Sequence, residues 1–232
     1  MTLRIDKYIS NATDLSRVET KRFIKAGEVT VDGEIITNPA QKISGDEEIC
    51  IDGSIISKAA HRYFMLNKPA GVVSATRDNS HTTALDLIYE HRSAELQVAG
   101  RLDVDTTGLL LITDDGQWNH RLTAPRSDCQ KIYRVELATP ISPDYQERLA
   151  NGVWLEGEKH PCLPATLEVL DDQTVLLSIA EGKYHQVKRM FAALGNHVKA
   201  LHRTQVGGIT LDETLEPGEY RALTPDEVAS II

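Results

Sequence analysis

The spacing of hydrophobic residues divides the first 58 positions into two helices followed by short strands. Apolar residues recur at helical spacing over 5–9, and a second helix begins at the capping box of Ser16 and Glu19 and stops at Gly27. Beyond Gly27 apolar and polar residues alternate, and Asp32-Gly33 is a tight-turn signal between strands. The pattern predicts a compact α/β module over residues 1–58.

The pattern of residues 59–232 predicts short strands interspersed with short helices. Because many strands follow one another closely, we expect a mostly antiparallel central sheet flanked by helices. The fold class is therefore α+β, with a second domain over 59–232 and a linker over 54–61. The predicted strands cover 63–66, 109–112, 131–137, 153–155, 166–170 and 175–179, and the predicted helices cover 84–91, 117–122, 143–151, 186–194 and a short segment after Thr224.

Composition excludes several classes of protein. With 232 residues and 41% hydrophobic content the chain can bury a substantial core, yet no apolar run approaches the roughly 20 residues of a membrane helix. The N-terminus has no signal-peptide pattern, so we expect a cytoplasmic protein without a membrane partner. Cys50, Cys129 and Cys162 are widely spaced and odd in number, which favours reduced thiols over a disulfide framework or a zinc cluster.

The net charge of -9 conceals two basic clusters. One covers 183–203, where five Lys and Arg residues and three His residues occur without an acid, and the other covers 121–134. Such clusters in an acidic chain fit a focused site for a polyanion, although a solvated surface gives the same pattern.

Residues 100–116 carry the best candidate nucleophile. A polar, glycine-bounded loop presents Arg101, Asp103 and Asp105, and residues 109–112 predict the buried strand that supports it. The motif also matches the signature of magnesium-dependent aspartyl phosphotransferases, but Arg101 competes with a metal for the carboxylate there. The spacing also matches the calcium-binding loop of an EF-hand, which needs a helix where this strand begins. The third interpretation is nucleophilic or general-base catalysis by Asp103 on a nucleic acid, with Asp105 shaping the turn.

The N-terminal module resembles the S4-like RNA-binding domain in residues 4–7, 16–17 and 27–33. That resemblance implies binding of structured RNA through the helical face, against the plainer alternative of a solvated helix. The cations that share one face of the second helix are assigned to RNA contact, and they are Arg17, Lys21, Arg22 and Lys25.

The second domain resembles the small-subunit group of rRNA pseudouridine synthases. Residues 100–110 match the signature loop of that group, whose single essential Asp falls at Asp103. Residues 63–71, 131–135 and 181–190 match further motifs in the same order, and the similarity continues through 196–221. The resemblance implies isomerisation of one uridine in 16S rRNA, at position 516, with neither a metal nor a small-molecule cofactor.

The resemblance also implies roles for individual residues. Asp103 attacks or deprotonates the ribose near C1′ of a base that has left its stack, and Tyr133 stacks on the uracil. Lys188 pairs with Asp103, with Arg189 as the alternative partner, and Arg101 either inserts into the vacated helix or steadies the loop. Further RNA contacts are assigned to Arg101, Lys68, Lys131, His185, Gln186, Arg189 and Arg203.

Two rival functions stay open at this point. A synthase of the same class could act on large-subunit rRNA, and a non-enzymatic RNA-binding or assembly factor could retain the fold. The intact set of Asp103, Tyr133 and Lys188 argues against the second rival. We expect a monomer whose partner is 16S rRNA or a small-subunit ribosomal assembly intermediate.

Overall fold

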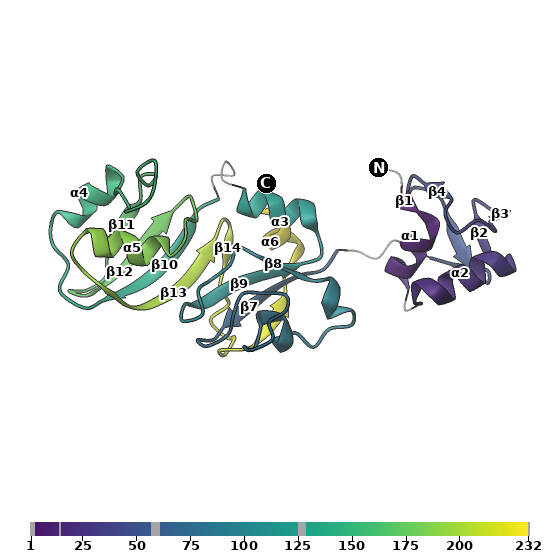
Figure 1. Ribbon diagram of the computed structural model, residues 1–232, viewed down its shortest axis with the longest axis horizontal. Coiled ribbons are helices and arrows are strands. Elements are labelled where there is room, and N and C mark those ends of the chain that lie inside the picture. The colour runs from purple at the N-terminus through teal and green to yellow at the C-terminus, as the bar shows by residue number, and fades with distance from the viewer. Residues whose placement is uncertain (1–2, 14, 57–60, 125–128, 232) are drawn as a thin grey trace. The chain divides into compact units, whose positions relative to one another are not determined.

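The computed structural model describes residues 3–13, 15–56, 61–124 and 129–231 (Figure 1). The chain divides into two compact units, Met1–His61 and Arg62–Ile232. The domain boundary predicted between 58 and 59 lies outside the described residues. Across the described ranges, no helix has both the length and the apolar character needed to cross a bilayer.

Two helices of the N-terminal unit pack on short strands. α1 (Ile5–Ala12) is followed by α2 (Arg17–Ala26), where Ser16 Oγ accepts a hydrogen bond from Glu19 N–H while the Glu19 carboxylate accepts one from Ser16 N–H. This confirms the predicted capping box, and Gly27 ends the helix with a left-handed φ of 76°.

The strands of this unit form a four-stranded sheet in the order β3-β2-β5-β6 and a separate β1-β4 pair. β6 lies within the segment that the sequence predicted as a linker. The sequence does not reveal this strand, because its side chains are exposed and only its backbone pairing with β5 defines it. The strands are β1 (Leu3–Arg4), β2 (Val29–Val31), β3 (Glu34–Ile35), β4 (Lys42–Ile43), β5 (Ile49–Ile51) and β6 (Ser54–Ile55).

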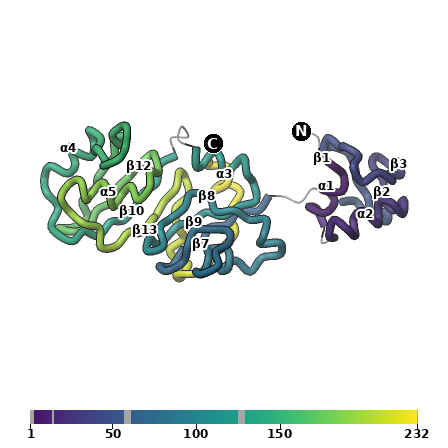
Figure 2. The backbone as a smooth tube through the Cα atoms, viewed as in Figure 1, coloured from purple at the N-terminus to yellow at the C-terminus, as the bar shows by residue number. Residues whose placement is uncertain are grey.

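The second unit is built on a nine-stranded sheet in the order β11-β12-β10-β13-β9-β7-β15, with β8 on β9 and β14 on β13. Figure 2 follows the backbone through the middle of this sheet, where β10, β13, β9 and β7 are labelled. Neighbouring strands are antiparallel except β13 and β9, which pair in parallel. The expected mostly antiparallel sheet is confirmed. The strands are β7 (Tyr63–Lys68), β8 (Gln97–Ala99), β9 (Thr107–Thr113), β10 (Lys131–Leu137), β11 (Thr166–Val169), β12 (Thr174–Ile179), β13 (Val198–Val206), β14 (Ile209–Thr210) and β15 (Tyr220–Ala222).

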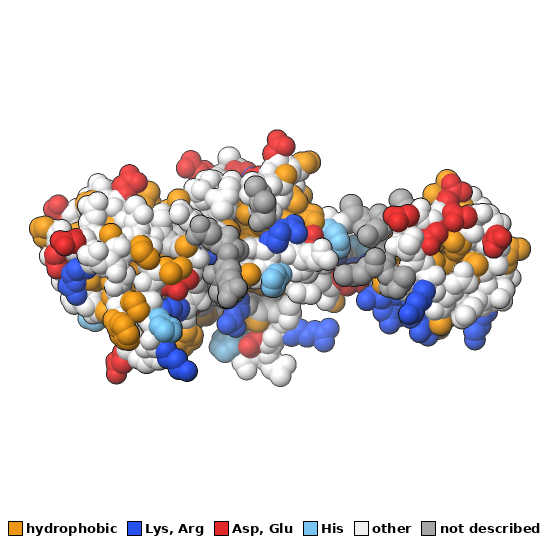
Figure 3. Space-filling view, turned by 90° about the horizontal axis from the view of Figure 1, so that it is seen from above, with side chains coloured by type: hydrophobic (Ala, Val, Ile, Leu, Met, Phe, Trp, Pro, Cys, Tyr) orange, Lys and Arg blue, Asp and Glu red, His pale blue; other side chains and the backbone are white. Residues whose placement is uncertain are grey.

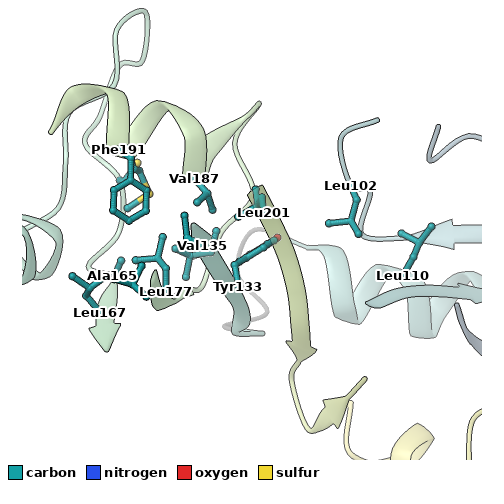
Figure 4. Packing of buried hydrophobic residues seen from close by; sticks show 14 of the residues in the cluster. Leu102, Leu110, Tyr133, Val135, Ala165, Leu167, Leu177, Val187, Phe191 and Leu201 are labelled. Carbon is teal, nitrogen blue, oxygen red and sulfur yellow. The ribbon is translucent and has the colours of Figure 1, made fainter. Parts of the chain in front are cut away.

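Helices cover both halves of this sheet. α4 (Tyr145–Ala150) and α5 (Gln186–Ala193) lie over the half that contains β10 to β12, and Figure 4 shows Val187 and Phe191 of α5 above Val135 and Leu177. α3 (Gly116–Thr123) and α6 (Pro225–Ala229) cover the other half. There Trp118 is fully buried, and its indole N–H donates to the Val228 carbonyl at 3.0 Å.

Two predicted elements are wrong. The helix expected over 84–91 is a 3₁₀ turn, η1 (Ala84–Leu87), which Thr83 caps and which ends where Ile88 becomes extended; η2 (Ser93–Glu95) follows it. Residues 153–155 form no strand, although their burial alternates around Trp154, which is 60% exposed. The alternation there arises because Val153 and Leu155 join the hydrophobic core of the unit without forming a strand.

Gly108 is the point where β9 and β13 meet, and we expect Gly108→Ala to be strongly destabilising. Its φ is 96°, and a Cβ there would overlap the Arg203 carbonyl oxygen and lie 2.9 Å from the Arg203 nitrogen. Because both clashing atoms are backbone, the free energy of unfolding should fall by about 3 kcal/mol or more. Urea unfolding measures this loss.

Gly116→Ala is the matched control for that variant. Gly116 opens α3, has open space around its Cβ position and does not need a positive φ. Its replacement should leave stability unchanged or raise it by about 0.5–1 kcal/mol. Equal effects at the two glycines would contradict the role given to the close β9–β13 approach.

Candidate active site

Asp103 lies on the loop between β8 and β9, and hydrogen bonds fix the backbone on both sides of it. The Asp103 carbonyl accepts from Thr106 N–H at 3.1 Å. Ser74 Oγ donates to the Leu102 carbonyl at 2.8 Å and accepts from Leu102 N–H at 3.0 Å. Because Leu102 is buried between these contacts, the Asp103 side chain has a defined direction.

Arg203 supports the same loop from β13. Its side chain is only 2% exposed, and its Nε donates to the Leu109 carbonyl at 2.8 Å while Nη2 donates to the Gly100 carbonyl at 2.7 Å. The sequence assigned Arg203 to RNA contact. The structure instead commits its guanidinium to the backbone that flanks the candidate nucleophile.

Lys68 is a second buried cation beneath the loop. Its ammonium donates to the Pro69 carbonyl at 2.8 Å and to the Val104 carbonyl at 3.3 Å. Burial lowers the pKa of Lys68 to about 8, although the carboxylates of Asp105 and Asp103 oppose this shift. Lys68 was also assigned to RNA contact, and it lies inside the unit rather than at its surface.

Lys188 bridges the two carboxylates of the loop. Its Nζ lies 3.0 Å from Asp103 Oδ2 and 2.6 Å from Asp105 Oδ1. Burial opposes its charge, but the hydrogen bonds to Asp105 and Asp103 outweigh that effect and raise the pKa of Lys188. The same hydrogen bond lowers the pKa of Asp105 despite its partial burial. Asp105 was expected to cap the following turn, and the structure pairs it with Lys188 instead.

Arg189 faces away from the two aspartates. Its guanidinium donates to Glu158 Oε1 and the Tyr184 carbonyl, both at 3.0 Å, and to the Glu156 carbonyl at 2.6 Å. Between the two basic residues of α5, the structure therefore brings Lys188 rather than Arg189 to Asp103.

Gln186, another predicted RNA contact, is buried at the start of α5. Its amide donates to Glu181 Oε1 at 2.8 Å, and its oxygen accepts from Lys183 N–H at 2.8 Å. These bonds close the loop before α5, so the amide is fully used within the protein.

His185 lies between Asp103 and an exposed tyrosine. Its Nε2 is 3.5 Å from Asp103 Oδ1, and its backbone is left-handed with a φ of 48°, a conformation that costs a non-glycine residue free energy. Its ring stacks on Tyr184 with centroids 3.8 Å apart and planes 20° apart. Tyr184 is 75% exposed and was not singled out by the sequence.

The loop opens into a cavity of about 900 Å³, in which Asp103 and Tyr133 both line the wall. Tyr133 is buried on β10, and Figure 4 shows its side chain extending toward the side where Leu102 lies. Arg101 and Lys131 line the same cavity, Arg101 exposed and Lys131 buried. An aromatic ring, a carboxylate and cations around one hollow suit a nucleotide whose base has left its stack.

The predicted basic face of the N-terminal unit is exposed in the structure. Figure 3 shows Lys and Arg side chains gathered on one side of this unit and Asp and Glu side chains on the opposite side. The four cations of α2 are all exposed, and they are Arg17, Lys21, Arg22 and Lys25.

Ser74 is a residue that sequence reasoning missed, because a lone serine in a loop carries no signal of its partner. We expect Ser74→Ala to lower kcat/KM by about 10-fold, since two hydrogen bonds to the Leu102 backbone disappear and Asp103 loses its fixed direction. Ser80→Ala changes an exposed serine of the same segment and should have no effect. Single-turnover kinetics compare the two, and equal rates in both variants would contradict the positioning role.

Comparison with known families matches both units. Residues 62–193 match the model of the RNA pseudouridylate synthase family, and residues 3–49 match the S4 domain. The chain belongs to the RNA pseudouridylate synthase family, and it is an isomerase. That membership excludes the interpretation of the loop as a magnesium-dependent phosphotransferase site.

Individual relatives narrow the comparison within this family. The chain is 54% identical to the ribosomal small subunit pseudouridine synthase A of Vibrio cholerae, over 99% of each chain. It is 51% identical to the protein of that name from Escherichia coli K12, over 99% of this chain and 100% of the other. A crystal structure of a pseudouridylate synthase superimposes with a TM-score of 0.73 at 46% identity, covering 99% of this chain and 100% of that one.

Proposed function

We propose that this protein converts one uridine of 16S rRNA, at position 516, to pseudouridine, acting as a monomer in the cytoplasm without a metal or cofactor. The proposal rests on the full-length similarity to the small-subunit enzymes named above. Among the structural features, the contact of Lys188 with Asp103 carries it furthest, because it joins a cation to the candidate nucleophile at the wall of a cavity of about 900 Å³.

The isomerisation breaks the N1–C1′ bond and forms a C5–C1′ bond, while the proton of C5 is lost and N1 gains one. Asp103 acts on the ribose near C1′, as a nucleophile or as a base, and both routes need the anion. The Lys188 ammonium contacts this carboxylate at 3.0 Å, which orients Asp103 for either route. Tyr133 forms the aromatic surface against the uracil while the base turns, since stacking holds a ring without fixing its rotation.

Ordered backbone around Asp103 supports the same proposal. The buried cations Arg203 and Lys68 hold carbonyls on either side of the loop, so the carboxylate is positioned before RNA arrives. Positioning in advance lowers the entropy cost of reaching the reactive geometry. We assign these two residues to positioning rather than to RNA contact.

The basic face of α2 is the proposed RNA contact of the S4 unit. Replacing its four cations, Arg17, Lys21, Arg22 and Lys25, by Gln should weaken RNA binding, with kcat at saturating RNA unchanged. Each phosphate contact contributes to the salt dependence, so the slope of log K against log salt should become shallower by up to about 3. Filter binding at several salt concentrations measures this, and the control is Lys42→Gln, which replaces an exposed lysine of β4.

A map of pseudouridine in rRNA tests the proposed function directly. In a strain that lacks this protein, one 16S position should lose the modification, and the wild-type chain should restore it while Asp103→Asn should not. Loss of a site in 23S rRNA instead would make the target a large-subunit uridine. Loss of no site would favour a non-enzymatic role for the same fold.

A further inference from the structure

Lys131 is a buried cation that forms no ion pair with a carboxylate in the part of the chain that the structure describes. It is the first residue of β10 and is 9% exposed. Its cross-strand neighbours, Ile179 and Val206, are buried and apolar. The titratable groups that act on it are Cys129 and Arg203, and within the described residues no carboxylate forms an ion pair with it.

The surroundings of Lys131 disfavour its charge. Burial lowers the pKa of Lys131 and the cationic Arg203 lowers it further, while Cys129 opposes the shift. Arg203 cannot turn away, because its donors are bound to backbone carbonyls. Lys131 also lines the cavity, where water can reach its ammonium in the free protein.

RNA that fills the cavity removes this water. An ammonium that loses its hydration without gaining a partner is costly, so the bound substrate must provide the compensating anion or acceptor. Each nucleotide brings one phosphodiester. Tyr133 is two residues along β10 on the same face, roughly 7 Å away, so a uracil against Tyr133 has its flanking phosphates within reach of the long Lys131 side chain.

We propose that Lys131 binds a phosphodiester immediately flanking the target uridine, inside the cavity. The inference rests on the proposed function and adds a phosphate-binding site inside the cavity of that enzyme. The exposed Arg101 can keep its hydration in the complex, whereas the buried Lys131 exchanges cavity water for a charge-assisted bond to the phosphate. Lys131 therefore anchors the backbone while the base turns.

Lys131→Met separates this role from a structural one. Removing an unpaired buried charge should leave the urea midpoint unchanged or raise it. Single-turnover kcat/KM on small-subunit particles reconstituted with 16S rRNA should nevertheless fall by about 10- to 100-fold. Lys199→Met removes an exposed lysine of β13 that does not line the cavity, and its kcat/KM should stay near that of the wild type.

A neutral methylphosphonate at each phosphate flanking the target identifies the partner. At the phosphate that Lys131 binds, the substitution should slow the wild type as much as Lys131→Met does, and it should not slow Lys131→Met further. If the two effects multiply at every flanking position, the ammonium binds something else, such as a uracil carbonyl, and the proposal is overturned. A lower urea midpoint for Lys131→Met would also overturn it. Wild-type protein that modifies no 16S uridine would refute the proposed function instead.

Tyr184 carries a second, independent inference. One face of its ring stacks on His185, which a left-handed backbone places beside Asp103, and 75% of Tyr184 is exposed at the cavity wall. Stacking on His185 orients the tyrosine and leaves its other face open. We infer that this face stacks on the base of a nucleotide adjacent to the target uridine.

An abasic nucleotide beside the target tests the Tyr184 platform. Tyr184→Leu should lower kcat/KM by about 5- to 100-fold, mostly through KM, and Tyr184→Phe should keep the wild-type value because stacking does not need the hydroxyl. On RNA with an abasic site at the stacked position, Tyr184→Leu and wild type should react equally. If the abasic site and Tyr184→Leu lower kcat/KM multiplicatively at both nucleotides beside the target, the inference is overturned. It is also overturned if Tyr184→Phe lowers kcat/KM as much as Tyr184→Leu does.

Discussion

Asp103→Asn should abolish pseudouridine formation. The amide matches the carboxylate in size and keeps the loop contacts of its backbone, but it is neither a nucleophile nor a base toward the ribose. Removing the reacting group of an enzyme costs about 10⁴-fold or more in kcat. Tritium release from 5-tritiated uridine in 16S rRNA measures the rate, and the Kd for RNA should change by less than about 3-fold because binding draws on many other contacts.

Asp105→Asn is the matched control, since the second carboxylate contacts the same ammonium and its side chain is 67% exposed. We expect a loss of about 10-fold or less, because Lys188 then pairs with Asp103 alone. A rate in Asp103→Asn close to that of the wild type would remove Asp103 from the reaction. Equal losses in both variants would mean that the two carboxylates act as a pair.

Lys188→Gln should lower kcat by about 10²- to 10³-fold at neutral pH and change how the rate depends on pH. In the wild type the ammonium contacts both carboxylates, and its hydrogen bond lowers the pKa of Asp105. Without it the pKa of Asp105 should rise, so the carboxyl group beside Asp103 stays protonated up to a higher pH. The acid limb of the single-turnover rate should therefore move to higher pH.

Two variants distinguish this electrostatic effect from a loss of structure. Lys188→Arg keeps the positive charge and should recover most of the shift of the acid limb, while imperfect geometry leaves kcat below that of the wild type. Arg189→Gln alters the neighbouring cation, which contacts Glu158 rather than Asp103, and should leave the acid limb in place. An unmoved limb in Lys188→Gln would contradict the assigned role.

The sequence predicted those elements whose pattern is set locally. Three examples are the capping box of α2, the buried strand β9 and the apolar face of α5. Each follows from the spacing of polar and apolar residues within one short segment of the chain. The strand predicted at 153–155 failed because alternating burial can arise from loop packing. β6 was missed because its side chains are exposed and backbone pairing leaves little trace in the sequence.

The candidate site was predictable only in part, because charge alone does not reveal burial. Asp103 and Tyr133 line one cavity and Lys188 contacts Asp103, although the three residues are far apart along the chain. Lys68 and Arg203 were assigned to RNA by the family resemblance, yet backbone carbonyls bind both cations inside the unit. Such long-range partners follow from sheet topology, which a single sequence does not specify.

The contact between Asp103 and Lys188 joins residues 85 positions apart, and this separation sets when catalysis can begin. Chains are made from the N-terminus at about 5–20 residues per second, so the loop exists for roughly 4–17 seconds before its counter-ion is synthesised. β13, which supplies Arg203, is made later still. During synthesis the S4 unit can be complete and able to hold RNA, while the unfinished second unit cannot yet react with it.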